Sequence, residues 1–346
     1  MKWNLLASVC ALLFCGTVLT SGTAIEPKEK TNLGDEVEPS FIVPDDGSVA
    51  AAFKAAEERK DTSARFIIYI RDGKYMLTGD SGDSIEVEGV KHPSPMTTLS
   101  APNVTIVGES MEGVILTNKP IHEGISITAT LRLAPESRNT EIRNLTILNG
   151  YNYNDRQFAG RAVALQDKST GTRCKNVVLL SNQDTYYSNN NEGIFYFEDC
   201  EIHGTVDFIC GGGDATFLRC RLVLEDRKNG DCITAPGVPL KNGYVFRDCI
   251  IDGPESQNKR FSLGRPWKNG SRCQYINTRM NILPRKEGWT VMRDYVLPVR
   301  MAEYGSVDVS GVAIDLSERR SAWGPDSAKV NISPVLTKEE AELLLK

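Results

Sequence analysis

The sequence predicts an all-β fold, a right-handed parallel β-helix with short capping helices at its ends. One short strand motif recurs along the middle of the chain, at Ile142–Ile147, Cys174–Leu179, Phe197–Ile202, Phe217–Leu222 and Phe246–Ile251. A constant motif at variable intervals is typical of a solenoid, in which coils stack strand on strand and insertions fall in loops. A β-sandwich would need regular hairpin turns, and Asn229–Gly230 and Asn242–Gly243 are too few.

Each copy of the motif has an Asn or a Cys at what looks like the matching position. The intervals between these residues are 32, 24, 20 and 29 residues. We expect five of them in or near one stacked row: Asn144, Asn176, Cys200, Cys220 and Cys249. Asn103, ahead of the strand Val104–Val107, is a candidate first member of the row.

The N-terminal segment is expected to direct export. Lys2, the apolar run Leu5–Leu19 and the small residues at 22–24 are typical of a secretory signal peptide over residues 1–24. The apolar run is too short for a membrane span. A linker is expected over residues 25–40, and the destination is periplasmic or extracellular.

A catalytic β-helix domain is expected over residues 41–330, followed by a helical tail over 331–346. Residues 48–60 are Ala-rich with apolar side chains at helical spacing, and precede a strand at Phe66–Ile70. This helix is expected to cap the first coil, because a solenoid must cover its exposed edges. Thr337 and Glu340 have the spacing of a capping box, which predicts a last helix to Lys346.

Charge and cysteine content restrict the partners and cofactors. The net charge of −5 argues against nucleic acid or an anionic membrane as a partner. Seven cysteines follow residue 24, and no CxxC pair or Cys/His cluster is present, so a zinc site is not expected. The predicted reaction requires neither a metal nor an organic cofactor. Export permits disulfides, but Cys200, Cys220 and Cys249 are expected to be stacked buried thiols. A monomer is expected.

Three separated segments carry the chemistry. Asp207 lies in an apolar strand between two glycine turns, and a buried carboxylate must be paired, protonated or catalytic. Gln183–Asp184 lies upstream, and Arg265 and Trp267 lie downstream. A nearby guanidinium would keep Asp207 ionised, whereas a second carboxylate and burial would raise the pKa of Asp184. Asp207 is therefore the candidate nucleophile and Asp184 the candidate acid.

Together these segments resemble the signature of the pectin methylesterases, a family of carbohydrate esterases. The resemblance covers roughly residues 41–325 and implies a pectin-lyase-like β-helix that acts on pectin, that is, methyl-esterified homogalacturonan. It implies that Asp207 attacks the ester, that Asp184 protonates the departing methanol, and that Arg265 orients Asp207. It also implies an oxyanion donor at Gln183. The implied substrate-binding residues are Trp267, Tyr187, Val206, Met292 and Thr130.

The sequence departs from the family pattern at two positions. Arg161 stands where the family has a second oxyanion glutamine, ahead of the strand 162–165. An arginine can donate to the oxyanion, which we favour, or it can pair with Asp184 or Asp207 and impair the site. Cys210 stands where the family commonly has phenylalanine, and Tyr151, Tyr153, Tyr186 and Tyr187 are candidates to replace that ring.

The predicted function is hydrolysis of the C6 methyl esters of galacturonan by an aspartyl nucleophile. Two alternatives remain open at this point. The first is a β-helix polysaccharide depolymerase: a galacturonan hydrolase can also use two aspartates, whereas a lyase would need calcium-binding acids and a basic proton acceptor. A non-catalytic carbohydrate-binding homologue would have the same fold, because function belongs to the site.

Overall fold

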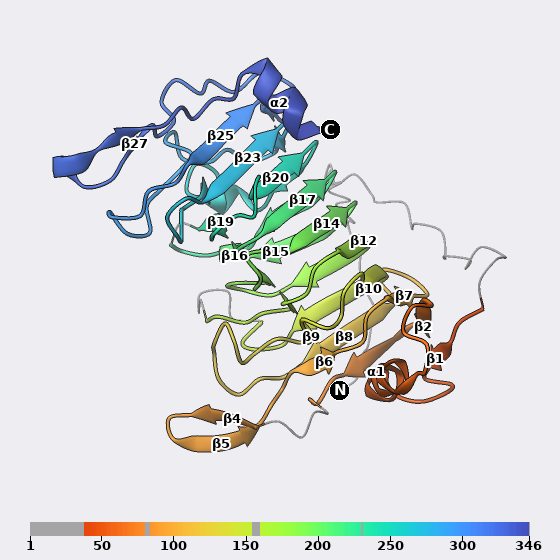
Figure 1. Ribbon diagram of the computed structural model, residues 1–346. Coiled ribbons are helices and arrows are strands. Elements are labelled where there is room, and N and C mark those ends of the chain that lie inside the picture. Colours follow the sequence, from red (N-terminus) through yellow and green to blue (C-terminus); the bar gives the residue numbers. More distant parts are fainter. Residues whose placement is uncertain (1–37, 80–83, 154–159, 230, 346) are drawn as a thin grey trace, which may run out of the picture. The chain divides into compact units, whose positions relative to one another are not determined.

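Successive turns of the chain stack strand upon strand as a right-handed parallel β-helix, which confirms the predicted fold class (Figure 1). The computed structural model describes residues 38–79, 84–153, 160–229 and 231–345. The expected signal peptide and most of the expected linker lie outside these residues. Within the described residues, no helix has the length and apolar character needed to cross a membrane.

One wall of the β-helix is a parallel sheet to which each coil adds one short strand. In the described residues its seven strands are β6 (Thr97–Leu99), β9 (Leu131–Leu133), β11 (Leu165–Asp167), β13 (Tyr186–Ser188), β16 (Val206–Gly211), β19 (Cys232–Pro236) and β22 (Ser262–Gly264). Alternate residues of these strands point inward, as Leu131, Leu165, Tyr186 and Ile209 do in the core. The intervening residues therefore face outward, which is where a substrate could meet them.

The other walls form one continuous parallel sheet. Its seventeen described strands are β1 (Phe41–Val43), β2 (Phe66–Ile70), β3 (Gly73–Met76), β7 (Val104–Gly108), β8 (Val114–Asn118), β10 (Glu141–Asn149), β12 (Thr172–Leu180), β14 (Ile194–Glu198), β15 (Glu201–Gly204), β17 (Asp214–Leu218), β18 (Arg221–Leu224), β20 (Tyr244–Arg247), β21 (Ile250–Asp252), β23 (Arg272–Ile276), β24 (Arg279–Met280), β25 (Arg300–Tyr304) and β26 (Val307–Asp308). The strand at Phe66–Ile70 is as predicted.

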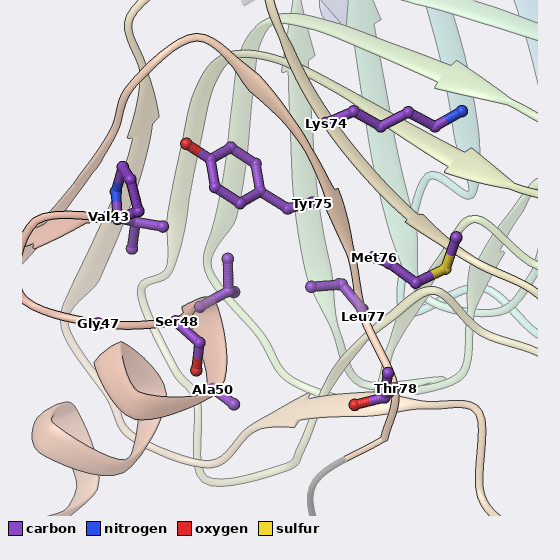
Figure 2. Close-up of a pocket in the computed structure, with 11 residues that line it drawn as sticks. Val43, Gly47, Ser48, Ala50, Lys74, Tyr75, Met76, Leu77 and Thr78 are labelled. Atoms are coloured by element: carbon purple, nitrogen blue, oxygen red, sulfur yellow. The ribbon is translucent and has the colours of Figure 1, made fainter.

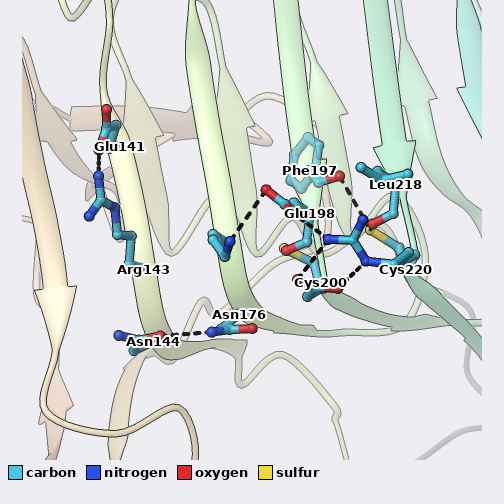
Figure 3. Close-up of polar contacts among 12 residues, drawn as sticks. Glu141, Arg143, Asn144, Asn176, Phe197, Glu198, Cys200, Leu218 and Cys220 are labelled. Carbon is cyan, nitrogen blue, oxygen red and sulfur yellow. Dashed lines mark hydrogen bonds and ion pairs between the residues drawn. The ribbon is translucent and has the colours of Figure 1, made fainter. Parts of the chain in front are cut away.

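Six successive coils bend at a single residue with left-handed backbone conformation. The residues at this bend have φ between 51° and 54° and follow one another from coil to coil: Asn144, Asn176, Asp199, Arg219, Asp248 and Asn277. Asn and Asp tolerate this conformation better than most residues because their short polar side chains can bond locally. We call these six residues the bend row. Asn176 Nδ2 donates to Asn144 Oδ1 at 3.2 Å (Figure 3). On the following coils of the row, Arg219 forms ion pairs with Glu198 and Asp199.

The predicted row of Asn and Cys was wrong by one position. The register pairs Lys175 with Glu198, so Asn176 corresponds to Asp199 and not to Cys200. Cys200, Cys220 and Cys249 follow the bend and lie in the core, while the Asn residues lie at the bend itself. Asn103 was also misplaced, because its neighbour on the next coil is Asn139, whose Nδ2 donates to Asn103 Oδ1 at 3.2 Å.

Aromatic rings and thiols fill the interior behind the bend row. The rings of Phe197, Phe217, Phe246 and Tyr275 stack in register, with centroids 4.9, 4.6 and 4.4 Å apart. The seven described cysteines are buried and unpaired, as expected for Cys200, Cys220 and Cys249. Burial of such large apolar side chains supplies most of the free energy that holds the coils together.

A helix lies near each described end of the solenoid (Figure 1): α1 packs into the core of the first coils, and α2 packs on the outer face of the last coils. Helix α1 (Val49–Glu58) buries Phe53 and begins at Ser48, whose Oγ accepts from the Ala51 amide at 3.1 Å. Helix α2 (Lys338–Leu345) has the predicted capping box: the Glu340 amide donates to Thr337 Oγ1 at 3.2 Å, and the Thr337 amide donates to Glu340 Oε2 at 2.9 Å.

Short elements complete the described chain. They are the antiparallel pairs β4 (Ser84–Val87) with β5 (Val90–Pro93) and β27 (Ala322–Trp323) with β28 (Val330–Asn331), and the 3₁₀ turns η1 (Glu255–Gln257) and η2 (Asp326–Ala328). A pocket beside the start of α1 is lined by residues of β3, among them Lys74, Tyr75 and Met76 (Figure 2). No residue predicted for the site lines it.

Candidate active site

The two candidate catalytic aspartates lie on adjacent coils. Asp184 directly precedes Thr185 and β13, and Asp207 lies in β16, the next strand of the same sheet. The Asp184 amide donates to the Val206 carbonyl at 3.2 Å, so the backbones of the two segments are in contact. Both aspartates have left-handed backbone, with φ of 60° and 50°, and each is only 4% exposed. Such conformations are costly in a strand, and they collect at functional sites.

Arg265 forms a bidentate ion pair with Asp207. Its Nε donates to Asp207 Oδ1 at 2.8 Å, and its Nη2 donates to Oδ2 at 2.6 Å. The segment after β22 brings it there, since the Arg265 amide donates to the Thr234 carbonyl at 2.9 Å. A planar guanidinium facing a carboxylate in this way fixes both its orientation and its charge.

The electrostatic environment separates the two carboxyl groups. Burial, followed by the charge of Asp207, raises the pKa of Asp184 to about 8. Burial also raises the pKa of Asp207, but the hydrogen bonds and charge of Arg265 oppose that rise. Among the described residues, Asp184 has no ion-pair partner, so the shared environment favours a proton on Asp184 and a negative charge on Asp207.

Gln183 and Arg161 lie on neighbouring coils at the same edge. A parallel bridge joins them, and the Ala162 amide donates to the Gln183 carbonyl at 2.9 Å. The Arg161 side chain bonds to neither aspartate. Its Nε and Nη2 donate to the two carboxylate oxygens of Glu123 at 2.9 and 2.7 Å.

An apolar wall stands on one side of the aspartates. Tyr187 and Trp267 face each other with ring centroids 6.2 Å apart, and both pack in one cluster with Met292 and Cys210. The register places Tyr187, Cys210 and Ala235 side by side on three successive strands. Tyr187 therefore supplies a ring next to Cys210, whereas Tyr186 faces the core and is fully buried.

A polar pocket adjoins the site. Gln183, Val206 and Arg265 line it together with residues that the sequence did not single out, among them Arg227, Asp231 and Arg285. Arg227 and Asp231 pair at 3.3 Å, and burial raises the pKa of Asp231 to about 7. In the described ranges, no three or more His, Cys, Asp and Glu side chains are grouped to hold a metal ion.

Thr130, like Tyr186, is a predicted site residue that the structure does not bring to the surface. It is fully buried, and its hydroxyl bonds to Asn118 Oδ1 at 2.8 Å and to the Leu148 carbonyl at 3.1 Å. A side chain so enclosed has no face left for a substrate, so its assignment as a substrate contact is corrected here.

Glu123, Arg227 and Asp231 were missed by the sequence analysis. Glu123 lies 38 residues before Arg161, and only the stacking of coils brings the two together. For Arg227 and Asp231 a weak signal was present: two opposite charges four residues apart, just ahead of the buried strand β19.

The arrangement can support acyl transfer. It offers a carboxylate fixed as a nucleophile, a buried acid that retains its proton near neutral pH, and an amide side chain, Gln183, at the rim. The same pair of carboxyl groups is also the equipment of a glycoside hydrolase, so geometry alone does not choose between them.

Sequence comparison identifies the family. The pectinesterase profile matches residues 42–335. A probable pectinesterase/pectinesterase inhibitor of Arabidopsis thaliana is 27% identical over 306 residues, covering 79% of this chain and 46% of the relative. Pectinesterase 2 of Citrus sinensis is 28% identical over 289 residues, covering 77% of this chain and 50% of the relative. The chain thus spans about half the length of these relatives.

Solved structures share the fold. Pectin methylesterase from carrot superimposes with a TM-score of 0.68 at 20% identity, covering 90% of this chain and 91% of the other. The enzyme from Yersinia enterocolitica gives a TM-score of 0.62 at 23% identity, with coverage of 85% and 95%. At these identities the likeness is one of fold.

Proposed function

The chain belongs to the pectinesterase family, and we propose that it is itself a pectin methylesterase with an aspartyl nucleophile. The observation that carries the proposal is the bidentate Arg265–Asp207 pair next to the protonated Asp184. A site of this kind separates the roles of two like side chains, because one carboxyl group is held ionised and the other is held neutral.

The reaction proceeds in two steps. The Asp207 carboxylate attacks the ester carbonyl carbon, Gln183 donates a hydrogen bond to the developing oxyanion, and Asp184 gives its proton to the departing methoxide. Methanol leaves, and the substrate acyl group is joined to Asp207 as an anhydride. Asp184, now ionised, takes a proton from water, which attacks the anhydride. The galacturonate acid and the free Asp207 are released, and Asp184 is protonated again.

The substrate is methyl-esterified homogalacturonan, bound without a cofactor by a monomeric enzyme. Tyr187, Trp267 and Met292 supply an apolar wall against which a sugar ring and its methyl ester can pack. Val206 borders the polar pocket. The net charge of −5 disfavours binding of nucleic acid and anionic membranes.

The chain is exported to the periplasm or beyond, with residues 1–24 removed. The proposed catalytic domain is then 41–330, with 331–346 as its tail. N-terminal sequencing of the exported protein should begin after residue 24, and retention of those residues would contradict this assignment.

Methanol release from pectin tests the function. Wild type should release methanol without forming new reducing ends or unsaturated products, whereas either of the latter would favour a depolymerase. Asp207→Asn should lower kcat by roughly 10³-fold or more, because it removes the nucleophile. Asp326→Asn, at a highly exposed side chain, is the matched control and should leave kcat unchanged. An inactive wild type that still binds pectin would support the non-catalytic alternative.

A further inference from the structure

Glu123 engages Arg161 through three hydrogen bonds. Besides the two side-chain contacts, the Arg161 amide donates to Glu123 Oε2 at 2.9 Å. The adjacent Gly124 amide donates to the Arg161 carbonyl at 2.8 Å, so backbone and side chain are fixed together. Because Glu123 binds both the backbone amide and the guanidinium group of Arg161, this side chain has little freedom to turn toward a substrate.

Arg161 nevertheless lies within electrostatic reach of the catalytic acid. A parallel β-bridge pairs Arg161 with Gln183, the residue before Asp184. The positive charge of Arg161 lowers the pKa of Asp184. The other groups that face Asp184 are Asp207, Arg265, Cys210 and Tyr187. Arg161 itself faces Glu123 and Asp184.

We propose that Glu123 is a positioning residue for the catalytic acid, acting through Arg161. By holding the guanidinium, Glu123 keeps the Arg161 donors away from the oxyanion and keeps the positive charge of Arg161 from moving closer to Asp184. Asp184 therefore keeps its proton over a wider range of pH. This inference rests on the function proposed above, in which protonated Asp184 is the acid.

Charge balance explains why an arginine at this position needs Glu123. An uncompensated positive charge near a carboxyl group favours its ionised form and so lowers its pKa. An ionised Asp184 cannot protonate methoxide. Because the Arg161 and Glu123 side chains are 46% and 39% exposed, water screens part of the effect, and the expected shifts are modest.

The test is the alkaline limb of the kcat–pH profile, which reports loss of the Asp184 proton. Glu123→Gln weakens the hold on Arg161 and lets its guanidinium move toward Asp184, so the limb should move to lower pH by about 0.5 unit or more. Arg161→Gln removes the positive charge, so the limb should move to higher pH. In the Arg161→Gln background, Glu123→Gln should have less than half of its effect with Arg161 present, as a double-mutant cycle requires for coupled residues.

Two variants separate positioning from general structural support. Glu123→Asp keeps the charge and should keep the limb close to its wild-type position. Glu136→Gln, at an exposed glutamate elsewhere, is the matched control. A uniform loss of kcat at every pH with an unmoved limb in Glu123→Gln would overturn the proposal, and so would an equal shift in the presence and absence of Arg161.

A readout without turnover keeps this proposal distinct from the proposed function. Titration of the Asp184 carboxyl carbon by ¹³C NMR should show a lower pKa in Glu123→Gln than in wild type. If wild type releases no methanol, the proposed function fails, yet this titration still decides the role of Glu123. If methanol is released and the titration does not move, Glu123 is not a positioning residue.

Discussion

The two aspartates of the site are held in costly states, both in backbone and in charge. Each has a left-handed φ and is 4% exposed. The pKa of Asp184 lies near 8, against an ordinary value of about 4 in an unfolded chain. The folded protein therefore binds a proton at Asp184 that the unfolded chain releases, and this contribution to stability is lost as pH rises from about 4 through 8.

Asp184→Asn should consequently stabilise the protein at alkaline pH while abolishing activity. Asparagine mimics the neutral acid, and at pH 5 only the unfolded chain ionises Asp184, so the variant should be more stable by only about 1.4 kcal/mol there. At pH 9 the wild type must hold a buried charge, and the variant should be more stable by at least about 2 kcal/mol, since each pKa unit corresponds to about 1.4 kcal/mol. Denaturant unfolding at both pH values measures this. Equal effects at pH 5 and pH 9 would contradict the raised pKa.

Sequence motifs located the residues that define the site because each stands in a distinctive short segment. Asp184, Asp207, Arg265 and Trp267 were named in this way, and the structure brings them together. Glu123 could not be found, because its contact with Arg161 depends on the stacking of separate coils. Thr130 was misassigned because its burial is set by neighbours from other coils, such as Asn118.

At the scale of elements, strands β15 and β18 have a charged cluster on their outer face. His203 Nε2 and Nδ1 contact Glu201 at 2.5 Å and Glu225 at 2.9 Å, so the imidazolium form donates to both carboxylates. Burial lowers the pKa of His203, but the hydrogen bonds to Glu201 and Glu225 outweigh it and raise the pKa above its ordinary value. Its stabilising effect is complete below about pH 6.5 and is lost as pH rises through the folded pKa.

His203→Gln should therefore destabilise the protein mainly at acidic pH. We expect a loss of about 1–2 kcal/mol in the free energy of unfolding at pH 5.5 and a clearly smaller loss at pH 9. Because the difference is taken between variant and wild type, the titration of Asp184 cancels. His92→Gln on β5, outside this cluster, serves as the control. A loss that grows toward pH 9 would refute the assignment of a protonated His203.

The strand motif predicted the fold correctly, but the alignment of its Asn and Cys residues from coil to coil was wrong by one position. Asn and Cys look equivalent in the sequence because both follow charged residues in short strands. The left-handed residue at the bend interrupts the alternation of inward and outward side chains, so Cys200 lies one position beyond the residue that matches Asn176. The hydrophobic pattern does not report a positive φ, and register across coils was needed to see it.

At the scale of the whole molecule, α2 covers an apolar strip on the outer face of the last described coils. Ala341 is 1% exposed and packs in a cluster, separate from the main core, with Val245, Ile276 and Ala302. Without α2 this apolar strip would be exposed to solvent, which favours aggregation.

Ala341→Asp should therefore lower Tm and promote aggregation, because it places an unpaired charge against that cluster. We expect a loss of about 2 kcal/mol or more. Leu343→Asp on the same helix is the matched control, since Leu343 is 68% exposed, and it should leave Tm nearly unchanged. Equal effects of the two substitutions would show that α2 does not act as a cover. Light scattering during a thermal scan records both properties.

The bend row fixes how successive coils are aligned, although the number of residues in a coil varies. Consecutive bends are separated by 32, 23, 20, 29 and 29 residues, yet each falls at the same place on its coil. Loops between bends can therefore lengthen or shorten without loss of alignment. A deletion at Arg219 or Asp248, the two bends between Asp207 and Arg265, would instead put the following coil out of phase, and Asp207 would no longer meet Arg265.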